Sequence, residues 1–187
     1  GGNHAHESLQ AGIAKKVADY VVFSQNECFN VLDTPWSPSK GIGMQSYGKQ
    51  FWIIYNKCWG QKFGIYGGST LGSSDIDYYM IGNLIVGCDS ESEPYPADAY
   101  YPSGLFLSGS TRAYIVNNTI VNNTSGMLFY QPFAKLRVME NNIISGVTHS
   151  NGVHMDIGAN YQTNIISNNN LLGQSNEVER IKFNSIV

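Results

Sequence analysis

The feature that most constrains this chain is a short motif that recurs six times. It reads Asn, any residue, an apolar residue, any residue, then Asn or Gly, and we call it the Asn corner. The copies begin at Asn26, Asn56, Asn83, Asn118, Asn142 and Asn169. Their spacing varies by insertions around a period of roughly 30 residues, and such a period is typical of a solenoid.

Each corner lies between two short apolar segments, which we interpret as strands. A large apolar residue stands three positions before the Asn, at Phe23, Ile53, Met80, Ile115, Met139 and Ile166. A second set follows two positions after it, at Cys28, Cys58, Ile85, Ile120, Ile144 and Leu171. We expect both sets to point inward and to stack in successive coils. Stacked Cys28 and Cys58 have parallel side chains, which are poorly disposed for a disulfide.

The Asn itself is expected to bend the chain. Asn tolerates the left-handed conformation that a sharp bend requires. Its side-chain amide can also bond the Asn of the next coil, forming a ladder.

A second marker follows each corner after a linker, namely a Gly that opens an alternating strand. It stands at Gly41, Gly64, Gly104, Gly126 and Gly152, and Val178 replaces it in the last coil. We call these segments the Gly-led strands. Residues 2–7 look like the same kind of strand from a preceding coil. The pattern therefore predicts three short strands per coil, with parallel pairing between coils.

The Asn corners and inner stacks resemble those of the right-handed parallel β-helix superfamily. That superfamily includes pectate and other polysaccharide lyases, pectin-cleaving glycoside hydrolases and phage tailspikes. The resemblance implies an all-β fold, a right-handed parallel β-helix of about six coils with an Asn ladder. We expect a single domain over residues 1–187. The chain starts and stops in the middle of the repeat pattern, which indicates a fragment of a longer protein.

Charge and hydropathy exclude some partners. Only 13% of the residues are charged, the net charge is −3, and no basic run is present. Because phosphate binding needs clustered Lys and Arg, nucleic acid is not an expected partner. No stretch of 18 apolar residues exists, so no membrane span is expected. The three Cys do not indicate a redox compartment.

The resemblance implies a secreted or cell-surface protein that binds polysaccharide along the outer face of the Gly-led strands. The residues expected to contact it are His4, His6, Gln45, Tyr66, Phe106 and Tyr130. A row of rings at coil spacing offers π surfaces on which sugar C–H groups can stack. The alternative is that Tyr66, Phe106 and Tyr130 form a cross-strand stack that only stabilises the sheet.

Four residues near the C-terminal end are catalytic candidates for a lyase or hydrolase: His154, Asp156, Arg180 and Lys182. A lyase needs a base beside a uronate carboxylate and cations that stabilise the developing charge. Arg180 or Lys182 would be the base, His154 the acid, and Asp156 the orienting group or a calcium ligand. The alternative is a solvated ion pair between Asp156 and Arg180 or Lys182.

The long linker of residues 88–103 carries metal-ligand candidates. Asp89, Glu91 and Glu93 alternate along it, and such carboxylates can gather Ca²⁺ through oxygen ligands. A solvated acidic loop is the alternative. His4 and His6 share one face of their strand with a spacing that could hold a metal, and the alternative is a sugar-binding or simply exposed pair.

The outward positions of the strands before the Asn are unusually apolar. Trp52, Tyr79 and Tyr114 stand where polar residues are expected on an exposed sheet. Another subunit, or the rest of the parent chain, would cover them. The second function hypothesis is therefore a non-catalytic structural or adhesive rod, self-assembling or receptor-binding like a tailspike. The sequence leaves open whether the protein is an enzyme.

Overall fold

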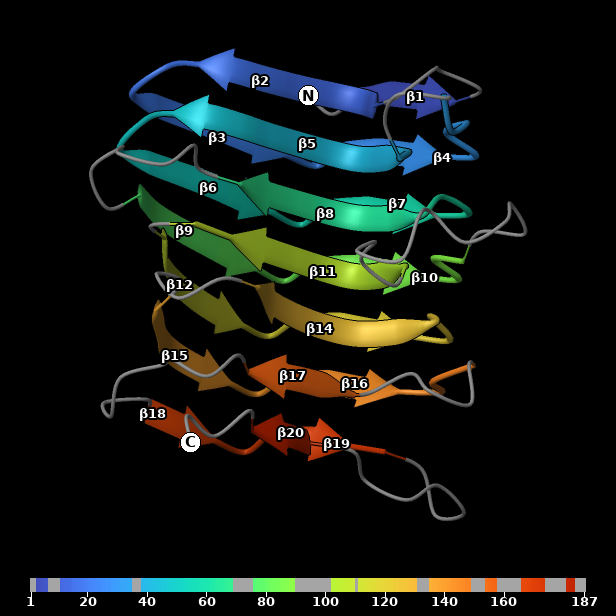
Figure 1. Cartoon of the computed structure of the whole chain (residues 1–187), viewed down its shortest axis with the longest axis vertical. Coiled ribbons are helices and arrows are strands. Elements are labelled where there is room, and N and C mark those ends of the chain that lie inside the picture. Colours follow the sequence, from blue (N-terminus) through green and yellow to red (C-terminus); the bar gives the residue numbers. More distant parts are fainter. Residues whose placement is uncertain are drawn as a thin grey trace.

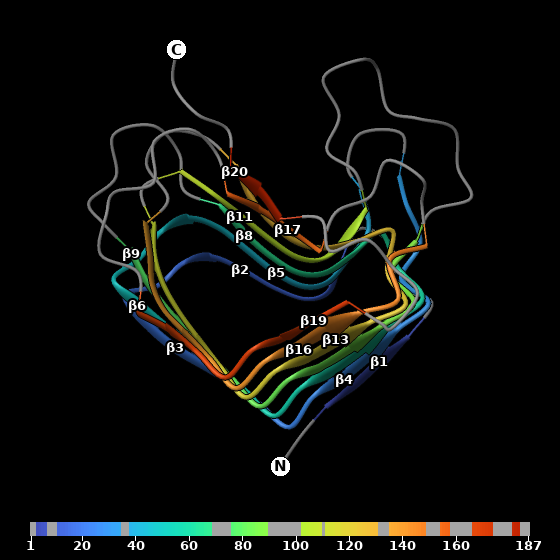
Figure 2. The same cartoon turned by 90° about the horizontal axis from the view of Figure 1, so that it is seen from below.

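Three all-parallel sheets wrap around one core, and two of them meet at the Asn corners (Figures 1 and 2). The structure is a computed structural model that describes residues 3–6, 11–34, 38–68, 76–89, 102–109, 111–130, 135–148, 154–157, 166–173 and 181–183. These residues form twenty strands and no helix. The described part of the chain therefore contains no helix with the length and apolarity that a membrane span requires.

Two of the sheets flank the Asn corners. The pre-Asn sheet consists of β3 (Tyr20–Ser24), β6 (Gln50–Ile54), β9 (Ile76–Ile81), β12 (Thr111–Val116), β15 (Lys135–Glu140) and β18 (Ile166–Asn168). The post-Asn sheet consists of β1 (His4–His6), β4 (Glu27–Phe29), β7 (Lys57–Trp59), β10 (Leu84–Val86), β13 (Thr119–Val121), β16 (Ile143–Ser145) and β19 (Leu171–Leu172). In both sheets each strand pairs with the equivalent strand of the next coil.

The third sheet is the Gly-led sheet. It consists of β2 (Ala11–Val17), β5 (Lys40–Tyr47), β8 (Phe63–Gly68), β11 (Ser103–Ser108), β14 (Ser125–Tyr130), β17 (Met155–Ile157) and β20 (Ile181–Phe183). The expected all-β solenoid of parallel strands, three to a coil, is confirmed. Its three walls are visible when the structure is viewed along its length (Figure 2).

The Asn ladder is confirmed, and Asn56, Asn83, Asn118 and Asn142 each donate both hydrogens of their side-chain amides. Asn56 Nδ2, for example, donates to Asn83 Oδ1 at 3.0 Å and to Phe23 O at 3.0 Å. The ladder runs through Asn3, Asn26, Asn56, Asn83, Asn118, Asn142 and Asn170. Because buried amides are costly unless bonded, this network ties neighbouring coils together at a fixed register.

The sequence predicted that the ladder Asn adopts the left-handed conformation. In the structure the residue before it does so instead. Positive φ occurs at Gln25, Tyr55, Gly82, Asn117, Asn141 and Asn169. A second set of left-handed residues ends the post-Asn strands, at Asn30, Gly60, Gly87, Asn122, Gly146 and Gly173. This second set explains why the motif ends in Asn or Gly, the residues that adopt this conformation at least cost.

The two ends of the chain correct the predicted register. His4–His6 pairs with β4 and follows the ladder residue Asn3, so it is a post-Asn strand and not a Gly-led strand. In the last coil Asn170, not Asn169, joins the ladder. Leu171 is consequently exposed, Leu172 packs against the core, and Ser167 rather than Ile166 pairs with Met139. In a run of three Asn, the sequence pattern alone does not distinguish the bend residue from the ladder residue.

The two predicted inner columns form the core in the coils between these ends. Ile53, Met80, Ile115 and Met139 are buried before the Asn, and Cys28, Cys58, Ile85, Ile120 and Ile144 after it. Phe23, at the N-terminal edge, is only partly buried against them. Cys28 and Cys58 are buried, free and in register, as expected for stacked small side chains, and Cys88 is also buried and free.

Candidate functional site

In its middle coils, the Gly-led sheet has the register that the sequence predicted for its outward-facing residues. Gly43, Tyr66, Phe106 and Leu128 lie side by side on β5, β8, β11 and β14. The leading glycines Gly41, Gly64, Gly104 and Gly126 are needed because a Cβ there would press against core side chains or the next backbone. Gly12, which the sequence analysis missed, occupies the same place in β2.

The rings on this face pack against one another. Tyr66 and Phe106 stack with centroids 5.0 Å apart and planes 10° apart, and Phe63 meets Tyr66 edge-on at 5.5 Å. Phe106 is only 1% exposed, and Leu128 completes the small cluster. Tyr66 and Phe106 thus form two members of the cross-strand stack that the sequence left as the alternative, and the side chain of the third member, Tyr130, lies outside the described part of the structure. Phe106 offers no exposed ring face to a sugar, whereas Tyr66 stays half-buried.

A lysine that sequence reasoning missed lies beside this cluster. Lys40 is 3% exposed, its Nζ donates to Pro38 O at 2.8 Å, and the same atom lies 5.1 Å from the centroid of the Tyr66 ring. Gly43 leaves room for its side chain, because a Cβ there would lie 3.2 Å from Lys40 Cδ. The only sequence feature that could have identified Lys40 is its position directly before the leading Gly41.

Burial controls the protonation of this group. Desolvation lowers the pKa of Lys40 to about 8, and the carboxylate of Asp33 partly opposes that change. Burial also lowers the pKa of Lys62, again opposed by Asp33. Burial raises the pKa of Tyr66, and a hydrogen bond with Ser108 opposes this.

The linker before β5 holds these groups in place. Asp33 Oδ1 accepts a hydrogen bond from the Ser39 backbone N–H at 2.6 Å, and Ser39 Oγ accepts one from the Lys62 backbone N–H at 2.9 Å. Asp33, Lys40 and Lys62 are therefore gathered where the linker enters the Gly-led sheet. Loops on a rigid scaffold are the usual location of function.

The C-terminal catalytic candidates are placed only in part. Asp156 and Lys182 are direct register partners on β17 and β20, as the sequence predicted. Met127 pairs with Met155, so His154 stands opposite Gly126 and takes the place of a leading Gly. His154 is therefore buried at 1% exposure instead of facing outward. The predicted alignment of Gly152 with Gly126 is therefore wrong by two residues. Arg180 lies outside the described residues.

The other binding candidates divide between two sheets. Gln45 and Tyr130 lie on the Gly-led sheet, in register with Gly68 and Ser108. His4 and His6 lie on the post-Asn sheet, in register with Glu27 and Phe29, so they do not belong to the predicted face.

The linker carboxylates show no metal cluster in the described ranges. Asp89 is exposed and accepts a hydrogen bond from Thr124 Oγ1 at 2.7 Å. Glu91 and Glu93 lie outside the described residues. Among the residues that the structure describes, no three His, Cys, Asp or Glu side chains lie close enough to share a metal ion.

A longer aromatic stack lies on the outer face of the pre-Asn sheet. Trp52 and Tyr79 stack at 4.0 Å, and Tyr79 and Tyr114 at 4.7 Å, each pair with planes 11° apart. All three side chains are half-buried. Stacked rings of this kind cover each other's faces and present their edges to solvent.

Comparison with protein-family models, with curated proteins and with solved structures finds no match to this chain. The assignment of function therefore depends on the geometry of the molecule itself.

Proposed function

We propose that this protein is a secreted or cell-surface right-handed parallel β-helix of the polysaccharide lyase-like superfamily. It binds acidic polysaccharide along the outer face of the Gly-led sheet. The observation that carries the proposal is Lys40, a lysine of lowered pKa held over the Tyr66 ring where a linker enters this face. A uronate carboxylate bound at the surface near Lys40 would favour the charged form of this buried amine.

Asp156 and Lys182 extend the proposed track two and three coils beyond Phe106, because both continue the register column of Tyr66 and Phe106. The residues proposed to contact the polysaccharide are thus Tyr66, Gln45 and Lys182. Lys40 is 3% exposed, so it is proposed to act on a bound carboxylate through its charge and not by direct contact. The ring faces themselves are not the contact, since Tyr66 and Phe106 use them on each other.

The test compares two lysine variants on a panel of uronate and neutral polysaccharides. Lys40→Met should weaken retention on uronate polymers in affinity electrophoresis at least fivefold. Lys49→Met is the control, because Lys49 is exposed and pairs with Asp19 at 3.0 Å. Release of unsaturated or reducing ends should be followed in the same samples. Equal retention of both variants on every polymer would refute the proposed site.

A second candidate function, the non-catalytic structural or adhesive rod, is favoured by the apolar stacks on the other two sheets. Besides Trp52, Tyr79 and Tyr114, Phe29 and Trp59 stack at 4.6 Å on the post-Asn sheet. If these faces serve assembly, light scattering should show concentration-dependent oligomers that Trp52→Ser reduces, without any dependence on polysaccharide.

A further inference from the structure

Three Asn-x-Ser/Thr triplets, the acceptor motif for N-linked glycans, lie close together in this chain. They begin at Asn117, Asn122 and Asn123. In a chain so rich in Asn, the motif needs support from its structural context, which for a glycan acceptor is an exposed loop or bend. The fold gives the three Asn side chains very different surroundings.

Asn123 does not have the surroundings of an acceptor. It is 2% exposed, and its Oδ1 accepts a hydrogen bond from the Cys88 backbone N–H at 2.7 Å. Its buried Nδ2 would lie 3.1 Å from a Cβ added at Gly104, so the neighbouring sheet leaves no room for a sugar on this nitrogen. Asn122 is exposed, but its Oδ1 lies against Gly146 of the next coil.

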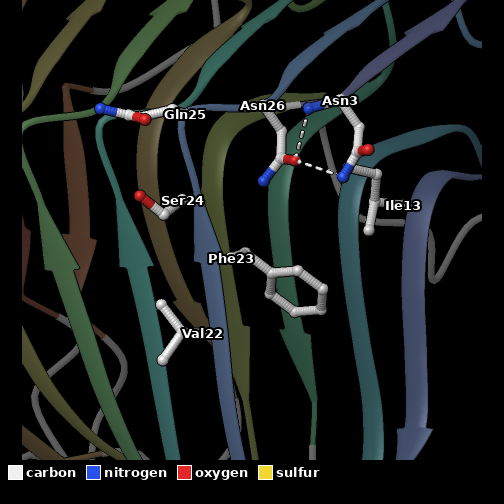
Figure 3. Close-up of a pocket in the computed structure, with 7 residues that line it drawn as sticks. All are labelled: Asn3, Ile13, Val22, Phe23, Ser24, Gln25 and Asn26. Carbon is white, nitrogen blue, oxygen red and sulfur yellow. Dashed lines mark hydrogen bonds between the residues drawn. The ribbon is translucent and has the colours of Figure 1, made fainter. Parts of the chain in front are cut away.

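Asn117 belongs to the bend column, by which we mean the left-handed residues that precede the ladder Asn. This column consists of Gln25, Tyr55, Gly82, Asn117, Asn141 and Asn169. Asn117 is exposed, whereas its neighbour Asn118, in the ladder, is only 1% exposed. Figure 3, a close-up of the cavity beside the first corner, shows the same division. Asn26 turns toward Asn3, and the Gln25 side chain points away from both.

The bend column contains one aromatic residue, Tyr55, in an unusual conformation. Its φ is 55°, a left-handed value that is rare for a bulky side chain. It is 60% exposed. A Cβ added at Gly82 would meet the Tyr55 ring, so this ring lies over the backbone of the next coil. A strained backbone at an exposed aromatic residue points to a function for its ring.

The ring of Tyr55 lies close to Asn117. The register of β6, β9 and β12 puts Tyr55, Gly82 and Asn117 in successive coils of the bend column. Because the ring lies over Gly82, it is about one strand spacing, ~4.8 Å, from the position of Asn117. A sugar bonded to Asn117 Nδ2 can place its C–H groups on a ring at this distance. Asn122 has no such ring, since nothing lies within 4 Å of a Cβ added at Gly87 in the preceding coil.

We propose that Asn117 is an N-glycosylation site whose first sugar packs against the Tyr55 ring. The proposal rests on the secreted location proposed above, because the donor in that route is a lipid-pyrophosphate-linked oligosaccharide. An oligosaccharyltransferase forms the bond between Asn117 Nδ2 and C1 of the first sugar and breaks the bond between C1 and the pyrophosphate oxygen. The lipid pyrophosphate leaves and takes up the proton that Nδ2 loses. The Asn corners lie opposite the Gly-led sheet, so the glycan leaves the proposed polysaccharide face open (Figure 2).

The site is tested on the full chain, secreted by a glycosylating eukaryotic cell line. Peptide N-glycosidase in heavy-oxygen water converts each glycosylated Asn to labelled Asp, and peptide mass spectrometry locates the label. We expect label at Asn117 and none at Asn123. Asn117→Gln should remove this label. Asn141→Gln is the matched control, because Asn141 is an exposed member of the bend column without the triplet, and it should leave the label unchanged.

Tyr55→Asn tests the contact with the ring, and this variant should fold because Asn tolerates positive φ. Removal of the glycan should lower the melting temperature by about 2–4 °C in the wild type. In Tyr55→Asn the loss should be clearly smaller. A glycan at Asn122, and the carboxylate that the enzyme leaves at position 117, act equally in both backgrounds and cancel in the comparison.

Absence of label at Asn117 in the secreted chain, or label at Asn123 in folded molecules, would overturn the proposed site. An equal loss of melting temperature in both backgrounds would overturn the contact with Tyr55. Retention on uronate polymers is scored separately with Lys40→Met, so failure of the proposed polysaccharide face produces neither result.

Discussion

Asn83 Oδ1 accepts two hydrogen bonds from Asn56, one from the backbone N–H and one from Nδ2, each at 3.0 Å. The Asn83 amide in turn donates to Ile53 O and to Asn118 Oδ1. Each interior Asn is thus donor and acceptor at once, and no other side chain of the same size can fill both roles.

Asn83→Asp should lower the free energy of unfolding by about 2–4 kcal/mol, because a carboxylate oxygen would replace a donor that faces two acceptors in the buried ladder. Urea denaturation monitored by circular dichroism measures the change. Asn117→Asp is the control, since Asn117 is exposed, has positive φ and precedes the ladder. Asp also tolerates this conformation. A similar loss of unfolding free energy in both variants would show that the ladder hydrogen bonds do not account for it.

Gly82→Ala should destabilise the fold more than Gly87→Ala. Both glycines have positive φ, so an added Cβ costs about 1 kcal/mol at either position. At Gly82 that Cβ would also meet the Tyr55 ring, whereas at Gly87 nothing lies within 4 Å. Thermal unfolding of both variants gives the difference.

The Tyr55 contact can be tested separately. In a Tyr55→Asn background, Gly82→Ala should cost no more than Gly87→Ala, because the ring is gone. If the excess cost of Gly82→Ala persists, it does not arise from Tyr55.

Tyr78→Phe should raise the free energy of unfolding by about 1 kcal/mol, since a buried hydroxyl without a partner is costly. Tyr78 is fully buried, and its hydroxyl has no hydrogen-bond partner among the described residues. Burial also raises the pKa of Tyr78 far above its usual value. Equilibrium denaturation checks the prediction, with Tyr114→Phe on the outer face as the control. A destabilised Tyr78→Phe variant would indicate that the hydroxyl is bonded.

Lys40 should titrate with a pKa of about 8 in side-chain NMR, because burial disfavours its charged form. Asp33→Asn should lower this pKa further, since the carboxylate opposes the effect of burial. Lys49, whose pKa Asp19 raises, is the reference signal in the same spectra. A Lys40 signal that titrates together with Lys49 would contradict its burial.

The same pKa change makes stability depend on pH. The folded pKa of about 8 lies below the unfolded value near 10.5, so the unfolded chain binds more protons between these limits. The contribution of Lys40 to the free energy of unfolding should therefore rise as pH increases from about 8 to 10.5. Comparison of the wild type with Lys40→Met across this window isolates the contribution from other titrating groups.

The sequence alone determined the solenoid, the Asn ladder and most of the inward columns. Repetition made this possible, because a position whose role is ambiguous in one coil is identified by the equivalent residues of the other coils. The prediction was wrong where equivalents were irregular. Asn169 and Asn170 compete for one ladder position, His154 replaces a leading Gly, and no described strand stands before β1 to identify it.

Only the tertiary structure decided which surface residues are available. Alternation correctly placed Tyr66 and Phe106 on one outward column, but their rings stack on each other, and Phe106 is buried. Lys40 acquires its lowered pKa only when the folded chain buries it, and Asp33 opposes that change. The physical reason is that the repeat encodes contacts between equivalent residues of neighbouring coils, whereas burial and pKa depend on linkers that do not repeat.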